Sequence, residues 1–147
     1  MSLRKAKMRN VTLTVIALLW MVASSCAGTP DEAYEKGVAY SRQGNYDQAL
    51  IEFNNAFDGS PKDAYTFGGR GNVYLCKGNF DQAIADCTKA VELMPEYGSG
   101  YQYRAYAYLA TAEYTKAWSD VRRAEALGII IDPVFLDGLK KVSGKDR

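Results

Sequence analysis

Apolar and polar residues alternate along most of this chain with the period of an α-helix, and the pattern recurs every 34 residues. In one segment Ala49, Phe53 and Ala56 follow each other at intervals of four and three, which places them on one helix face. A shift of one period superimposes small or aromatic residues: Gly37, Gly71 and Ala105; Tyr40, Tyr74 and Tyr108; Ala49, Ala83 and Ala117; Ala56, Ala90 and Ala124. A fixed period of this length predicts an array of stacked repeats.

Each repeat contains a turn at its midpoint and therefore predicts two antiparallel helices. Gly44-Asn45 and Gly78-Asn79 interrupt the helical pattern, and Pro61 and Pro95 close the first two repeats. The recurring glycine and alanine positions leave room for a large side chain of the facing helix. The expected partners are Tyr46, Phe80 and Tyr114.

The helix glycine, tyrosine, turn glycine, paired alanines and final proline of residues 30–63 resemble the tetratricopeptide repeat (TPR). Residues 64–97 keep this set, although Cys87 stands where the first copy has Phe53. Residues 98–131 match more loosely, because two alanines replace glycines and Ile129 replaces the proline. The resemblance implies an all-α fold, an α-solenoid of three TPR-like helical hairpins.

A capping helix with a short tail is predicted over residues 132–147. Asp132 suits the cap position of a helix, and Pro133 suits its first turn. An apolar face follows, as repeat arrays need at their end, formed by Val134, Phe135, Leu136, Leu139 and Val142. The run Ile129-Ile130-Ile131 is expected to tuck under this helix or, alternatively, to form a self-association patch.

The resemblance also implies a binding surface, since TPR hairpins curve and the first helix of each pair lines the concave side. The candidate peptide groove then consists of Tyr34, Val38, Tyr65, Asn72, Gln102, Tyr103 and Tyr106. Tyrosine offers a large contact area and keeps a hydroxyl for hydrogen bonding, which suits a peptide or helical ligand. In the alternative interpretation several of these side chains pack between repeats.

Some TPR proteins bind chaperone carboxyl tails with a clamp of lysine, asparagine and arginine. The matching positions do not support such a ligand, because they hold Tyr34, Val38, Gly69, Ser99 and Tyr103. The stretch Gly68-Gly69-Arg70-Gly71 fits neither a dinucleotide-binding motif nor a P-loop. Because glycine within a helix costs about 1 kcal/mol relative to alanine, this stretch predicts a locally weak helix, with close approach of a partner's backbone as the alternative.

The amino terminus has the order of a secretory signal. Basic residues lie in the first ten positions (Arg4, Lys5, Lys7 and Arg9), before an apolar run over 11–22 and small residues. The uncharged run over 11–25 is shorter than the roughly 20 residues that span a bilayer, which disfavours a permanent transmembrane anchor.

The small residues before Cys26 resemble the lipobox of bacterial lipoproteins, although Ala23 stands where leucine is usual. The resemblance implies a signal peptide at 1–25, lipidation of Cys26 with acyl chains such as palmitate, and a short tether at 26–29. Cleavage by an ordinary signal peptidase is the alternative. Ala27 stands where well-studied lipoproteins carry an aspartate for inner-membrane retention. The implied location is therefore the outer membrane, facing the periplasm.

Composition limits the chemistry available to the chain. Histidine is absent, and Cys76 and Cys87 form no CxxC pair, so the sequence predicts no metal site and no cofactor. We expect these two cysteines to be buried free thiols, with pairing in an oxidising compartment as the alternative. All 17 acidic residues follow position 30, and no basic cluster there is larger than an adjacent pair such as Arg122 and Arg123, which argues against nucleic acid.

These patterns favour a binding module over an enzyme. The chain has no histidine and no nucleophile with an adjacent base, so we predict no catalysis and no small-molecule substrate. The predicted function is a lipid-anchored scaffold or adaptor that binds another protein in the cell envelope. A secreted or signal-anchored regulatory subunit of an envelope enzyme, secretion or pilus complex is the alternative, and a spacer without a specific ligand is a third possibility.

Overall fold

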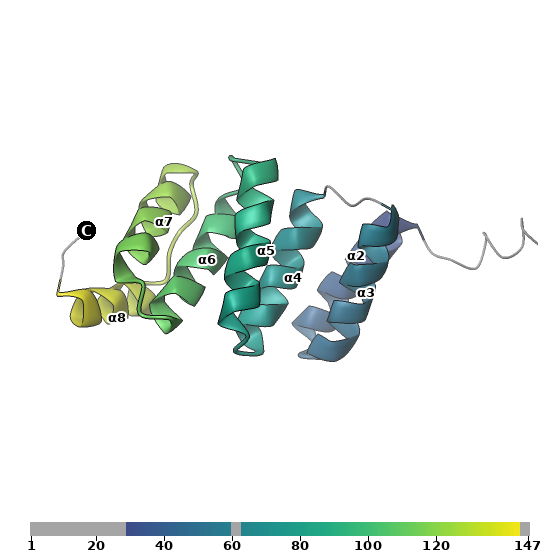
Figure 1. The fold of residues 1–147 in the computed structure, drawn as a ribbon, viewed down its shortest axis with the longest axis horizontal. Coiled ribbons are helices and arrows are strands. Elements are labelled where there is room, and N and C mark those ends of the chain that lie inside the picture. Colours follow the sequence, from purple (N-terminus) through teal and green to yellow (C-terminus); the bar gives the residue numbers. More distant parts are fainter. Residues whose placement is uncertain (1–28, 60–62, 145–147) are drawn as a thin grey trace, which may run out of the picture.

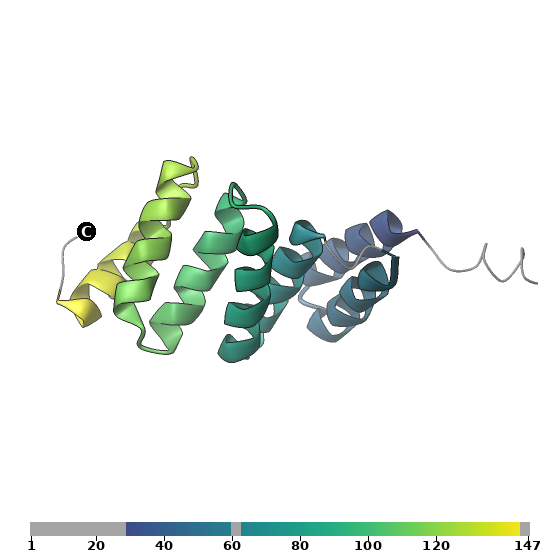
Figure 2. The same ribbon diagram turned by 45° about the horizontal axis from the view of Figure 1, so that its top comes forward.

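The computed structural model describes residues 29–59 and 63–144, and within them the chain forms seven α-helices and no strand. Three antiparallel pairs lie side by side in a row, followed by a single helix (Figures 1 and 2). The pairs are α2 (Pro30–Arg42) with α3 (Tyr46–Gly59), α4 (Ala64–Cys76) with α5 (Phe80–Leu93), and α6 (Gly98–Ala110) with α7 (Tyr114–Ala126); α8 (Pro133–Ser143) follows. The predicted all-α solenoid is confirmed. None of these helices is long and apolar enough to cross a membrane.

Side-chain caps fix where three of the helices begin. Thr29 accepts a hydrogen bond from the Glu32 amide at the start of α2. The Asp63 carboxylate accepts the amides of Tyr65 and Thr66 at the start of α4. Asp132 accepts the Val134 amide at the start of α8, as the sequence predicts. Each cap satisfies amides that have no partner within the helix, which is worth about 1 kcal/mol of helix stability.

The three hairpin turns share one backbone conformation, although one of them lacks glycine. The second residue after each first helix has a positive φ, of 76° at Gly44, 77° at Gly78 and 61° at Ala112. In each turn the amide of the next residue donates a hydrogen bond to a tyrosine carbonyl of the first helix, as Asn45 does to Tyr40 and Glu113 to Tyr108. Alanine in this left-handed region is strained because its Cβ crowds the backbone, whereas glycine is not.

The substitution Ala112→Gly is therefore expected to stabilise the protein by about 1 kcal/mol, because it removes the left-handed strain without removing a buried contact. The measurement is the free energy of unfolding in urea. The matched control, Gly78→Ala, places the same strain in the second turn and should destabilise by a similar amount. Equal stability of the wild type and Ala112→Gly would contradict this assignment.

Small residues allow the two helices of each hairpin to approach closely. Ala49, Ala83 and Ala117 are completely buried at the start of the second helices. Phe53 is 1% exposed and fills the space between two glycines of the first helices. A Cβ added at Gly37 would lie 2.9 Å from the Phe53 ring, and one added at Gly69 would lie 2.7 Å from it.

The glycine-rich stretch of α4 is accommodated by side chains of the same chain. A Cβ at Gly68 would lie 2.3 Å from the Tyr97 ring, and a Cβ at Gly71 would lie 2.7 Å from the Cys87 Sγ. Residues 64–76 form one continuous helix through this stretch. The structure thus gives a reason for the glycines: Phe53, Cys87 and Tyr97, from three other segments, pack against the bare backbone of α4.

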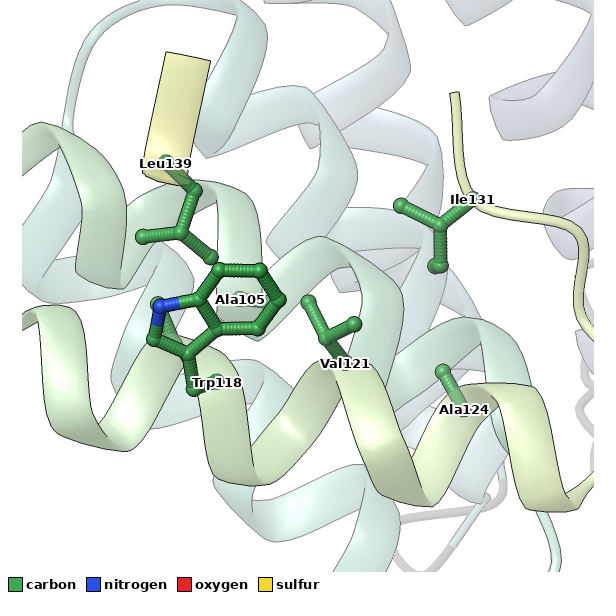
Figure 3. Close-up of a cluster of buried hydrophobic side chains, with 7 residues drawn as sticks. Ala105, Trp118, Val121, Ala124, Ile131 and Leu139 are labelled. Atoms are coloured by element: carbon green, nitrogen blue, oxygen red, sulfur yellow. The ribbon is translucent and has the colours of Figure 1, made fainter. Parts of the chain in front are cut away.

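The last hairpin and α8 share the largest buried cluster. Trp118, Val121, Ile131 and Leu139 meet between α7, the connecting segment and α8 (Figure 3). Of the isoleucine run, Ile131 is buried as expected, Ile129 packs beside Gly98, and Ile130 is 91% exposed. The capping helix covers the third hairpin while Val134 and Val142 remain on its exposed side.

Two buried ion pairs occur at equivalent places, one period apart, and join neighbouring hairpins. Arg104 binds both oxygens of Asp120 at 2.7 and 2.9 Å, and its third nitrogen donates to Thr88 of the preceding hairpin. Arg70 makes the same set of contacts with Asp86 and Asn54. Each guanidinium thus connects the helices of its own hairpin to the second helix of the hairpin before it. These pairs were not predicted from the sequence, although the period aligns Arg70 with Arg104 and Asp86 with Asp120.

Candidate peptide-binding groove

Three of the predicted groove residues gather around a fourth tyrosine that the sequence analysis missed. The rings of Tyr65 and Tyr97 meet edge to face, with centroids 5.2 Å apart. Burial raises the pKa of Tyr97, and the nearby phenols of Tyr103, Tyr34 and Tyr65 raise it further. We call Tyr34, Tyr65, Tyr97 and Tyr103 the tyrosine cluster. It brings side chains of α2, α4 and α6 together with the segment between α5 and α6.

Tyr97 reaches the cluster because two glycines leave room for its ring. It lies just before α6, and its ring contacts the backbone positions of Gly68 in α4 and Gly100 in α6. Any side chain at Gly68 would overlap this ring. The local pattern assigns Tyr97 to the end of a repeat, next to Pro95, and gives no sign that its ring inserts between two first helices.

The other predicted groove residues, Val38, Asn72, Gln102 and Tyr106, also lie on the first helices of the three hairpins. Val38 is half-buried against the cluster formed by Ala49, Phe53 and Val73. Tyr106 packs on Phe135 of α8, with ring centroids 4.3 Å apart, and its hydroxyl accepts a hydrogen bond from Gln102. Asn72 is half-exposed on α4. Val38 and Tyr106 therefore contribute to packing as well as to the surface.

A pocket of about 310 Å³ opens beside the tyrosine cluster, where the first turns of α2 and α4 lie close together. Tyr34 and Tyr65 form part of its wall. The remaining lining residues are Pro30, Asp31, Glu35, Ala56, Asp63 and Thr66. The pocket is thus aromatic and acidic.

The two cysteines of the second hairpin differ in environment. Cys87 is completely buried under Gly71, as expected, whereas Cys76 is exposed at the end of α4. Both thiols are free. Burial raises the pKa of the Cys87 thiol to about 12, because the thiolate would lose its hydration, and the charge of Asp86 raises it further.

We predict that N-ethylmaleimide modifies Cys76 in the folded protein and leaves Cys87 intact at both pH 7 and pH 9. The thiolate is the reactive form, and a thiol with a raised pKa stays protonated below that pKa. Mass mapping of labelled peptides measures both sites in one sample. Labelling in 8 M urea is the control and should modify both, so native modification of Cys87 at the rate of Cys76 would refute its burial.

Models of the tetratricopeptide repeat match residues 33–63 and 64–97, which are the first two hairpins. The chain contains TPRs. The third hairpin repeats their backbone turn and their buried alanine positions.

Solved TPR domains have the same fold. The first TPR of Spaghetti (RPAP3), bound to the HSP90 peptide SRMEEVD, superimposes with a TM-score of 0.71 at 28% identity, covering 79% of this chain and 91% of that one. The first TPR domain of human RPAP3 gives 0.70 at 27% identity, with 80% and 92% covered. The Arabidopsis OM64 TPR domain gives 0.72 at 23% identity, with 80% and 96% covered. No curated protein matches the chain.

These similarities support a protein-interaction role for the TPRs of this chain. The residues at the positions of the lysine, asparagine and arginine clamp are Tyr34, Val38, Gly69, Ser99 and Tyr103. Two of them belong to the tyrosine cluster, and Gly69 is covered by the Phe53 ring. This chain therefore presents aromatic surface where the clamp would present basic side chains.

Proposed function

We propose that this chain is a lipid-anchored TPR adaptor of the bacterial cell envelope, which binds a peptide or helical segment of another protein in its groove. The observation that carries the binding role is the tyrosine cluster. It brings tyrosines from the first helices of all three hairpins together around Tyr97, and all of them except the exposed Tyr65 are partly buried. Aromatic side chains of this kind dominate the affinity of protein interfaces.

The proposed ligand differs from the chaperone tail of the solved complexes. In the solved structure, the first TPR of Spaghetti (RPAP3) is bound to the peptide SRMEEVD, which contains three acidic residues. The clamp positions of this chain contain no lysine or arginine, so an acidic tail would lose its charged partners. A segment with apolar or aromatic anchor residues suits the tyrosine cluster better.

Support for the anchor comes from the sequence alone, because Cys26 lies outside the described residues. A basic start, an apolar run and small residues precede this cysteine. A diacylglyceryl thioether with a further acyl chain provides more than one membrane signal, which stable anchoring requires. The proposed location is the outer membrane, facing the periplasm, and the proposed role involves no catalysis.

Binding through the groove is tested with the double variant Tyr65→Ala, Tyr103→Ala. Partners are captured by crosslinking in the native envelope and identified by mass spectrometry, and their affinity is then measured with the purified proteins. We expect at least a tenfold loss of affinity with little change in the melting temperature. The control is Val134→Ala, which removes an exposed apolar side chain of α8. Equal capture by the double variant would refute the groove.

The anchor is tested separately with Cys26→Ala. Fractionation of cells that express the full chain should move the protein from the membrane to the soluble periplasmic fraction, and labelling with a palmitate analogue should disappear. Full membrane retention of the exported variant would reject lipidation. Processing of the wild type at another residue, without lipid, would favour the secreted regulatory subunit.

A further inference from the structure

The pocket between α2 and α4 has an acidic wall next to aromatic rings. Asp31, Glu35 and Asp63 line it together with Tyr34 and Tyr65. No lysine or arginine of the described residues lines this pocket. The negative charge of these carboxylates reaches the Tyr34 phenol. Burial raises the pKa of that phenol, and the charges of Asp63 and Glu35 raise it further.

The three carboxylates differ in the hydrogen bonds and ion pairs that they already form. Asp63 is held in place by capping α4, where it accepts the amides of Tyr65 and Thr66. Asp31 and Glu35 are exposed and form no ion pair with another described residue, whereas the adjacent Glu32 binds Lys36 at 2.7 Å. Two acidic groups thus line the pocket with no ion-pair partner in the part of the chain that the structure describes.

The helix termini offset only part of this charge. Two helices begin at the pocket, and each N-terminus carries the equivalent of about half a positive charge. Against three carboxylates, roughly two negative charges remain. Such a site repels an anion and attracts a cation. Tyr34 and Tyr65 also line the pocket, and aromatic rings attract cations through cation–π interactions.

We propose that this pocket receives one lysine or arginine side chain of the partner segment that lies along the tyrosine cluster. The inference rests on the proposed binding function and deepens it by assigning a charge to the ligand. The pocket volume of about 310 Å³ lies at the small end of the range for ligand sites, which suits a single side chain. The partner is then a basic and aromatic or apolar peptide, opposite in charge to SRMEEVD.

The test begins with a random 12-residue peptide library selected on the full chain. We expect the selected peptides to share one lysine or arginine near apolar positions. For one such peptide, replacement of that residue by glutamine should weaken binding about tenfold, and 0.5 M NaCl should weaken the parent peptide while hardly affecting the glutamine form.

Variants then place the cation in the structure. The double variant Asp31→Asn, Glu35→Gln should bind the parent peptide about tenfold more weakly than the wild type does. It should bind the glutamine peptide with the same affinity as the wild type. The matched control is Asp81→Asn, Asp137→Asn, which also removes two exposed carboxylates, one of them in the first turn of a helix. This control should bind both peptides normally.

The outcomes separate the pocket from the groove. Selected peptides without a basic position, or a parent peptide that binds the amide variant and the wild type equally, would overturn the cation pocket alone. Peptides that bind the Tyr65→Ala, Tyr103→Ala variant with full affinity would overturn the groove itself. A synthetic peptide of residues 1–12, which contains Arg4, Lys5, Lys7 and Arg9, serves as competitor. Tighter binding of this peptide than of any selected one would reassign the pocket to the chain's own amino terminus.

Discussion

Replacement of Phe53 by alanine is expected to destabilise the protein by about 3–5 kcal/mol, the usual cost of emptying a core site of this size. The ring is 1% exposed and is held between Gly37 of α2 and Gly69 of α4. It also packs on Tyr34, with ring centroids 5.9 Å apart. Its removal therefore loosens the first hairpin and its contact with the second at once. Urea unfolding followed by circular dichroism measures the effect.

A second substitution at this site is expected to change stability in opposite directions with and without the Phe53 ring. In the wild type, Gly69→Ala should destabilise, because its Cβ would lie 2.7 Å from the Phe53 ring and overpacking costs about 1–3 kcal/mol. In the Phe53→Ala background the same change should stabilise by about 1 kcal/mol, since alanine favours the helix and fills part of the void. The two effects together form a double-mutant cycle.

A glycine that faces open space provides the control for this cycle. Gly138 lies within α8, and a Cβ there would meet no atom within 4 Å. Gly138→Ala should stabilise both backgrounds equally. If Gly69→Ala changes the stability equally with and without Phe53, then contact with the Phe53 ring is not the reason for a glycine at position 69.

The substitution Asp120→Ala should cost about 3 kcal/mol or more of unfolding free energy, because it leaves the Arg104 guanidinium buried without its main partner. The side chains of Arg104 and Asp120 are only 15% and 7% exposed. The Thr88 hydroxyl would remain as a hydrogen-bond acceptor of the arginine, at 3.0 Å. Urea titration again measures the loss.

Two companion variants distinguish a broken pair from a general weakness of the third hairpin. The double variant Arg104→Met, Asp120→Leu replaces the pair by apolar side chains of similar size and should recover most of the stability. The single variant Glu32→Ala removes the exposed Lys36–Glu32 pair and should leave the midpoint of urea unfolding almost unchanged. A double variant as unstable as Asp120→Ala would show that the charge is not the cause.

Much of the fold could be predicted from the chain alone because it depends on short-range interactions. The helical spacing of apolar residues, the turn glycines and the Asp132 cap each involve residues within a few positions of one another. Repetition at a fixed length then implies stacking, since a single hairpin cannot bury its apolar faces. The same local signals allowed the third hairpin to be recognised despite Ala112 in its turn.

The candidate site was only partly predictable. The period assigned Tyr34, Tyr65 and Tyr103 to first helices, and the structure brings them together with Tyr97. The insertion of Tyr97 over Gly68 depends on how far one hairpin stands from the next, which no local pattern encodes. Cys76 is also exposed, contrary to the expected burial, and it is the last residue of α4.

By itself, then, the sequence determined the number of hairpins, their turns, the capping helix and the choice of small residues where helices cross. Only the tertiary structure decided which side chain each glycine of α4 accommodates, that Arg104 and Asp120 meet across a hairpin, and that three carboxylates surround a pocket beside the tyrosines. Helices and turns follow from hydrogen bonds between near neighbours, whereas the contacts of the α4 glycines and of Arg104 with Asp120 join residues 16 or more positions apart and form only after the helices have packed.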